Sequence, residues 1–195
     1  MEESPLLSDV ERLTESLGKL PEPVDKPVFI AVSGLPGTGK SYFAKKLAER
    51  IPLVILESDA LRKVLFPSPT YSAVESARLF QASHLLIERL LREGISLILD
   101  ATNLVERHRE RLYRIAERLG VKLILVRIEA PPTLVKERLE RRAQLRESKS
   151  DAGWEVYQKL NTSVEAIKRR HFVVNTSRDI TPVINKIVRE VSKGD

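Results

Sequence analysis

One eight-residue stretch limits what this chain can fold into more than any other feature: Gly34-Leu35-Pro36-Gly37-Thr38-Gly39-Lys40-Ser41. It follows an apolar, β-rich run at residues 28–32 and precedes a segment of helical periodicity, which is the context that the pattern G-x-x-x-x-G-K-[ST] requires. Glycines let the backbone wrap closely around an anion, and the start of the following helix favours negative charge. The stretch therefore predicts a phosphate-binding loop.

The residue types in this loop indicate which phosphates it would hold. Lys40 can reach the β- and γ-phosphates of a nucleotide, and the Ser41 hydroxyl can ligate Mg²⁺, which prefers oxygen. No Asn-Lys-x-Asp segment for reading guanine stands near the last strands, so ATP is favoured over GTP. The nucleotide-binding residues that we expect are Gly34, Gly37, Thr38, Gly39, Lys40 and Ser41.

The rest of the chain alternates apolar runs with helical periodicity. Strands are predicted at residues 28–32, 53–56, 95–99, 121–128 and 172–174, and helices at 39–50, 59–65, 72–93, 104–119, 132–145, 153–170 and 180–191. Nearly continuous apolar strands are typical of a parallel sheet that is buried on both faces. We therefore predict a three-layer α/β/α fold in one domain, residues 28–195.

Residues 1–27 stand apart from this alternation as an N-terminal appendage. A short amphipathic helix is predicted at 8–17, after which Gly18, Pro21, Pro23 and Pro27 prevent regular structure.

Composition excludes several classes of protein. The chain has no cysteine and three histidines among 195 residues, which rules out disulfides and thiolate metal sites and leaves oxygen-bound cations. No apolar run approaches the roughly 18 residues of a membrane-spanning helix, and the acidic start lacks the basic region of a signal peptide. We therefore expect a cytoplasmic protein without membrane association. The histidines suggest no metal or nucleophile, and Trp154 and Tyr157 are interpreted as core residues of their helix.

Positive charge is concentrated in one part of the chain. The formal net charge is +6, and residues 105–170 contain 17 basic against 10 acidic residues. Such a stretch could be a nucleic-acid footprint, a clamp for a polyphosphate, or a set of solvated helix faces.

Polar residues follow the second and third predicted strands, where ligands of open parallel sheets bind. Asp59 and Arg62 follow the second strand and lie three residues apart on one helical face; a carboxylate there could orient and deprotonate an acceptor hydroxyl, and a guanidinium could hold it. The alternative is that Ser58 or Asp59 caps the helix and that Arg62 is solvated. Asp100 emerges from a fully apolar strand too early to cap the next helix, and could anchor Mg²⁺ through water.

Arginines supply two further candidate groups. Arg107, Arg109 and Arg111 lie on the helix predicted at 104–119. One of them could reach the ligand-binding crevice at the strand ends, while most are solvated. Farther on, Arg138 and Arg142 lie one turn apart in an arginine-rich lid at about 138–153, where Arg146 is a third candidate; lid arginines would stabilise a transferring phosphoryl group. A surface helix with mixed charge is the alternative.

Together, the loop from Gly34 to Ser41, Asp59 with Arg62, Asp100-Ala101-Thr102-Asn103-Leu104 with Arg107, and Arg138 with Arg142 resemble the P-loop kinases of the polynucleotide 5′-hydroxyl kinase and zeta-toxin type. The resemblance spans about residues 28–191. It implies the sheet order 2-3-1-4-5, Asp59 as the base that activates the acceptor, Arg62 as the group that holds it, and Arg138 and Arg142 as contacts to the donor phosphates.

These observations lead to one principal hypothesis and two alternatives. The hypothesis is ATP- and Mg²⁺-dependent transfer of a γ-phosphate to a hydroxyl, with Lys40, Asp59 and Arg142 as catalytic residues, Ser41 and Asp100 at the metal, and Asp100 and Arg107 near the acceptor. That acceptor could be a polynucleotide 5′-hydroxyl. The alternatives are a kinase of a sugar, nucleotide-sugar or antibiotic, and a non-catalytic ATP-switched module that binds nucleic acid. The turn Asn175–Arg178 is a candidate contact to the nucleobase.

Overall fold

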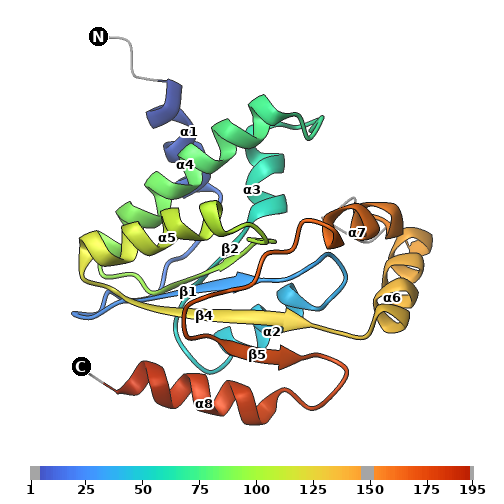
Figure 1. Ribbon diagram of the computed structural model, residues 1–195. Coiled ribbons are helices and arrows are strands. Elements are labelled where there is room, and N and C mark those ends of the chain that lie inside the picture. Colours follow the sequence, from blue (N-terminus) through green and yellow to red (C-terminus); the bar gives the residue numbers. More distant parts are fainter. Residues whose placement is uncertain (1–4, 146–151, 194–195) are drawn as a thin grey trace.

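A computed structural model describes residues 5–145 and 152–193 of the chain as a parallel sheet between two layers of helices (Figure 1). The elements in chain order are α1 (Pro5–Glu15), β1 (Val28–Ser33), α2 (Lys40–Ala48), β2 (Val54–Glu57), α3 (Ser58–Leu65), α4 (Ala73–Arg92), β3 (Leu97–Asp100), α5 (Glu106–Leu119), β4 (Lys122–Glu129), α6 (Pro132–Leu145), α7 (Trp154–Asn161), β5 (Phe172–Asn175) and α8 (Thr181–Ser192).

The sheet has five strands in the order β2-β3-β1-β4-β5, and every neighbouring pair is parallel. This confirms the predicted fold class and strand order. Because all strands run the same way, their carboxyl ends meet at one edge. There Glu57, the last residue of β2, lies opposite Asp100, the last residue of β3.

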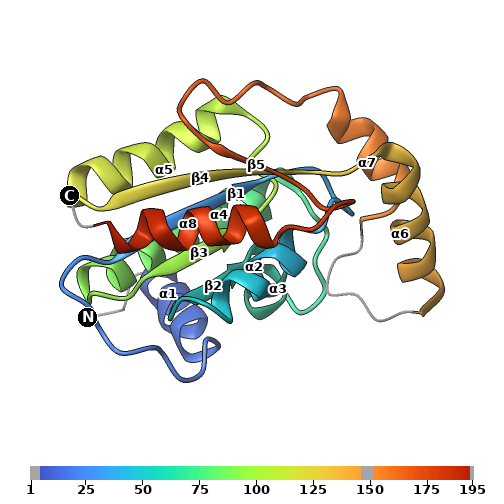
Figure 2. The same ribbon diagram turned by 90° about the horizontal axis from the view of Figure 1, so that it is seen from below.

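Two apolar cores lie on opposite faces of the sheet. Side chains alternate along β1, so Phe29 packs with α4 and α5 on one face while Ile30 packs with α2 and α8 on the other. Figure 1 shows α4 and α5 above the strands and α8 below them, and Figure 2, seen from below, shows α8 in front of the sheet. All six residues of β1 are buried, which explains its continuous apolar run. Within the described residues, no helix is long and apolar enough to cross a membrane.

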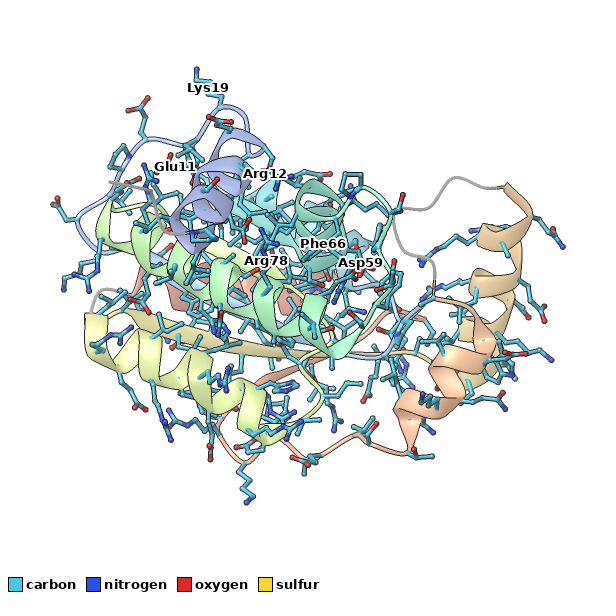
Figure 3. The ribbon with its side chains drawn as sticks, turned by 90° about the horizontal axis from the view of Figure 1, so that it is seen from above. Glu11, Arg12, Lys19, Asp59, Phe66 and Arg78 are labelled. Atoms are coloured by element: carbon cyan, nitrogen blue, oxygen red, sulfur yellow. The ribbon has the colours of Figure 1, made fainter. Side chains whose placement is uncertain are left out.

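The N-terminal helix packs against the rest of the domain. Leu13 of α1 is fully buried in the core that α4 and α5 share, and Asp9, which is 1% exposed, accepts hydrogen bonds of 2.5 and 2.7 Å from Arg78 of α4. Arg12 donates to the Val64 carbonyl of α3 at 2.6 Å. Figure 3 shows Arg12, Arg78 and Phe66 gathered where α1, α3 and α4 meet. Residues 16–27 form no helix or strand, in agreement with their prolines and glycine.

One predicted helix is wrong over half of its length. The helix expected at 153–170 ends at Asn161, and residues 162–171 contain no helix or strand. The reason is that Arg109 donates hydrogen bonds to the carbonyls of Glu165 and Ala166, and Glu165 donates its own N–H to the Leu104 carbonyl. These backbone groups pair with α5 and the segment before it, so they are used outside a helix.

Candidate functional site

A cavity of about 1230 Å³ opens at the edge where the parallel strands end. Its wall combines the loop after β1, the first turns of α2 and α3, the end of β3, one face of α6, and the turn after β5. Ligand sites in proteins commonly measure about 300–1,000 Å³. The cavity therefore has room for a nucleotide and part of a second molecule.

The loop after β1 has the backbone conformation that its glycines predict. Gly37 and Gly39 have φ angles of 78° and 98°, a region that L side chains rarely adopt. A Cβ atom on Gly37 would lie 2.9 Å from side-chain carbons of Val135 and Leu139, so α6 packs directly on the loop. The other end of the loop is held by Gly34, whose N–H donates to the Thr102 carbonyl at 3.0 Å. The loop is thus anchored on two sides.

Lys40 is the first residue of α2 and lies inside the cavity wall. Its ammonium group donates a hydrogen bond of 3.0 Å to the Leu35 carbonyl, so the side chain links the end of the loop to its second residue. Burial lowers the pKa of Lys40, while the charges of Asp100 and Asp59 act to raise it and that of Arg142 to lower it. An anionic phosphate in the loop would supply a counter-charge to this buried cation.

Ser41 and Asp100 form a hydrogen-bonded pair in the cavity wall that Lys40 also lines. The Ser41 hydroxyl donates to Oδ2 of Asp100 at 2.5 Å. Asp100 is 5% exposed, and burial raises its pKa although Lys40 and Ser41 act to lower it. Among the residues described, no group of three or more acidic or histidine side chains is arranged to hold a metal. This arrangement suits Mg²⁺, a hard cation that takes a few protein oxygens and completes its shell with phosphate oxygens and water.

Asp59 lies in the first turn of α3 and lines the same cavity. The helix begins after Glu57, and no side-chain capping bond is made there, so the capping role considered for Ser58 or Asp59 does not occur. The influence of Asp59 on the pKa of Lys40 places its carboxylate within the electrostatic reach of the phosphate-binding loop.

Arg62 follows on the next turn of α3 and is held by α4 and by the segment before it. Its guanidinium donates to the Ser76 hydroxyl at 3.2 Å, lies 3.6 Å from a Glu75 carboxylate oxygen, and stacks 5.0 Å from the ring centre of Tyr71. Its Nη1 is buried and has no hydrogen-bond partner among the described residues. This buried atom is the one that forms the ion pair with Glu75, so Arg62 is held against α4.

The two predicted lid arginines have different surroundings. Arg138 donates hydrogen bonds to the hydroxyl of Thr176 at 2.8 Å and to the carbonyl of Thr176 at 3.1 Å, and weaker ones to the carbonyls of Gly37 and Thr38. Burial lowers the pKa of Arg138. Its side chain therefore fastens the phosphate-binding loop to the turn after β5. Arg142 lines the cavity one turn farther on, where its charge reaches Lys40. Arg146 and the middle of the expected lid lie outside the described residues.

The structure does not bring Arg107 into the cavity wall. Arg107 is exposed on the outer side of α5. Arg109, one of three arginines of which we expected most to be solvated, is only 2% exposed and donates to the carbonyls of Asn103 and Leu104, both at 2.8 Å, and to Glu106. It is a structural residue that pins the segment after β3.

Further residues in the cavity wall were missed by sequence reasoning, among them Glu57, Tyr71 and Arg141. Glu57 ends an apolar strand as Asp100 does, so its position could have identified it. Arg178, which also lines the cavity, belongs to the turn Asn175–Arg178 that was expected to lie near the base. Trp154 and Tyr157 stack at 4.8 Å, and Tyr157 is buried against Val135 and Leu139, which confirms their core assignment.

Comparisons with known proteins agree with this architecture. Residues 29–167 match the model of a family described as an AAA domain, AAA_33. The L-seryl-tRNA(Sec) kinase of Methanococcus maripaludis is 33% identical over 122 residues, which cover 60% of this chain and 47% of that protein. The chain thus spans about half the length of that relative.

Two further matches extend over more of the fold. A UPF0200 protein of Aeropyrum pernix is 30% identical over 149 residues, or 70% of this chain and 74% of that protein. The APS kinase CysC of Mycobacterium tuberculosis, solved in complex with AMPPNP and APS, superposes with a TM-score of 0.65 at 18% identity and covers 88% of this chain and 100% of its own. At this identity the likeness concerns the fold alone.

Proposed function

Because this chain belongs to the AAA domain family AAA_33 of P-loop kinases, we propose that it is an ATP- and Mg²⁺-dependent phosphotransferase that moves the γ-phosphate of ATP to a hydroxyl group. The observation that supports this most directly is the position of Asp59. Its carboxylate shares one cavity with Lys40 and Ser41 and has no capping role in its own helix.

The loop residues would hold the triphosphate. The loop leads into the N-terminus of α2, where backbone N–H groups and the helix dipole favour an anion. Lys40 would leave the Leu35 carbonyl and contact the β- and γ-phosphates. Ser41 and Asp100 would hold Mg²⁺, which when bound neutralises charge on those phosphate oxygens.

In the transfer step, Asp59 would accept the proton of the acceptor hydroxyl. The hydroxyl oxygen then forms a bond to the γ-phosphorus, the bond from that phosphorus to the β–γ bridging oxygen breaks, and ADP leaves with the electron pair. Arg62, which lines the same cavity, would orient the acceptor, and Arg142 would face the charge that spreads over the transferring group. Arg138 would act by holding the loop in place.

Two classes of acceptor fit this site. A polynucleotide hydroxyl, such as a 5′-hydroxyl, agrees with the positive surplus of residues 105–170. The seryl-tRNA kinase relative, by its name, acts on a group that a nucleic acid carries. A sugar, nucleotide-sugar or antibiotic agrees with a cavity that has room for a second small molecule beside ATP. A screen with radiolabelled ATP across oligonucleotides and small hydroxyl compounds separates the two classes.

The Asp59→Asn variant tests the proposed chemistry. It keeps the shape of the side chain but removes the base, so ATP affinity should be retained while transfer falls by about 10²-fold or more. Lys40→Ala is the comparison variant and should impair both properties. If Asp59→Asn transfers phosphate at the wild-type rate, the proposed base is wrong. If the wild-type protein binds ATP but transfers phosphate to no acceptor, the chain is a nucleotide-switched binding module instead.

A further inference from the structure

We infer that the outer face of α5 is a docking surface for the phosphate backbone of a nucleic acid, which would make a polynucleotide the acceptor of the proposed transfer. The inference rests on the proposed function only for what happens to the docked strand. The surface consists of four exposed arginines, which we name the α5 arginine stripe: Arg107, Arg111, Arg114 and Arg118.

The spacing of these arginines places them in one row. They stand at positions i, i+4, i+7 and i+11 of a continuous helix, so with 3.6 residues per turn all four side chains leave the helix within a narrow sector. The buried residues of α5, among them Leu112 and Ala116, lie on the opposite side. The row is about 16 Å long at 1.5 Å per residue.

Most of the stripe lacks partner carboxylates. Within the described residues, Arg107, Arg111 and Arg114 make no ion pair, and only Arg118 has one, with Glu88. Some arginines elsewhere on the surface are paired, as Arg89 is with two glutamates and Arg127 with one. Unpaired like charges in a row create a local positive potential that attracts a polyanion.

The acidic residues of α5 do not interrupt the stripe. Glu106, Glu110 and Glu117 all leave the helix on one flank, and two of them are engaged elsewhere: Glu106 with the buried Arg109, and Glu117 with Arg169. A helix face that was merely solvated would be expected to intersperse both signs of charge.

A group of rings adjoins the stripe on its other flank. Phe80 of α4 lies 5.1 Å from His108 and 6.2 Å from His84, measured between ring centres. Burial lowers the pKa of both histidines, that of His84 to about 4, and the nearby arginines lower both further. The rings are therefore neutral near pH 7, and a basic row beside ring surfaces is typical of proteins that bind single-stranded nucleic acid.

The position of the stripe relates it to the cavity. Residues 101 and 102, which follow β3, lie in the cavity wall, and α5 begins at Glu106 a few residues later. Figure 1 shows α5 running away from the edge at which the strands end. The stripe is long enough to contact the phosphates of several consecutive nucleotides of a strand whose end would lie at the cavity.

Fluorescence anisotropy with a short labelled single-stranded RNA, in the absence of ATP, tests the inference. The triple variant Arg107→Glu, Arg111→Glu and Arg114→Glu should weaken binding by at least about tenfold, as the loss of three phosphate contacts predicts. The matched control is Lys19→Glu, Arg50→Glu and Lys186→Glu, which changes the net charge equally at exposed sites away from α5. Figure 3 shows Lys19 at the far edge of the molecule from α5. Equal losses in both variants would overturn the inference.

Salt dependence gives a second measurement. In the milder variant Arg107→Gln, Arg111→Gln and Arg114→Gln, the slope of log affinity against log salt should decrease by about 2, because each lost phosphate contact removes about 0.7 from the slope for a single strand. An unchanged slope would refute phosphate contacts by these residues. Competition by polyglutamate at equal charge concentration would identify the stripe as a surface for acidic proteins and would also overturn the inference.

The outcome is separable from that of the proposed function. Lys40→Ala should bind RNA like the wild-type protein, because Lys40 lies in the cavity and not on α5. Stripe-dependent RNA binding without phosphate transfer would disprove the kinase activity alone. Transfer to a small hydroxyl compound without RNA binding would disprove the docking surface alone.

Discussion

Arg109 offers a sharp test of how the segment after β3 is held. The Arg109→Leu substitution keeps an apolar stem of similar size but removes the guanidinium, which is 2% exposed. Five hydrogen-bond acceptors depend on that group: the carbonyls of Asn103, Leu104, Glu165 and Ala166 and the carboxylate of Glu106.

The magnitude follows from what is left behind. A buried acceptor that loses its donor costs about 1–3 kcal/mol, and removing one partner of a buried ion pair costs about 3–5 kcal/mol. Glu106 and the carbonyls nearest the surface can regain water, since Glu106 is 19% exposed. We therefore expect a loss of about 3–5 kcal/mol in the free energy of unfolding rather than the sum of all five contacts.

Urea unfolding followed by circular dichroism measures this loss as a lower midpoint with an unchanged slope. Arg107→Leu is the matched control, because it makes the same chemical change two residues away on the exposed side of α5; it should stay within about 0.5 kcal/mol of wild type. If Arg109→Leu costs less than about 1 kcal/mol, the guanidinium does not hold the segment in the way described.

Three further predictions follow from particular contacts. Gly37→Ala places a methyl group 2.9 Å from Leu139 in a left-handed backbone and should abolish detectable ATP binding by calorimetry, whereas Gly120→Ala, which has φ 61° but open space around it, should cost about 1 kcal/mol of stability and leave ATP affinity unchanged. Burial lowers the pKa of His84 to about 4, so the neutral imidazole stabilises the fold above pH 6.5 and this stabilisation is lost as the pH falls towards 4. The wild-type free energy of unfolding, measured by urea titration, should therefore fall by about 2 kcal/mol more between pH 7 and pH 5 than that of His84→Gln. Identical pH dependence in the two proteins would contradict this. Arg142→Ala should lower kcat more than ATP affinity in a steady-state assay, and an unchanged kcat would make Arg142 a solvated surface residue.

The sequence predicts the parts of this fold that depend on local pattern. The phosphate-binding loop was identified because its glycines, Lys40 and Ser41 must be adjacent in the chain, and the buried strands because apolar runs show burial on both faces. Asp100 was singled out because it directly follows such a run, and Asp59 because it stands three residues after another. The strand order came from the family resemblance, because residue pattern alone does not determine which strands are neighbours.

What the sequence could not predict depends on contacts between distant segments. Arg109 has the same local pattern as its exposed neighbour Arg107, and only the position of residues 162–171 against α5 makes it a buried donor. The same contact ended the helix expected at 153–170. Arg138 was assigned to the phosphates by resemblance, but the Thr176 that binds it is 38 residues away.

The docking of α1 has a practical consequence for anyone who works with a shortened form of this protein. A chain cut at Val28, where the proline-rich stretch ends, would lose the Leu13 side chain from the core and the hydrogen bonds that Arg78 donates to Asp9. The side of α4 that α1 covers would then expose hydrophobic surface to water, which favours aggregation. Residues that look dispensable by composition are thus part of what keeps the two helices bearing Asp59 and Arg78 in register.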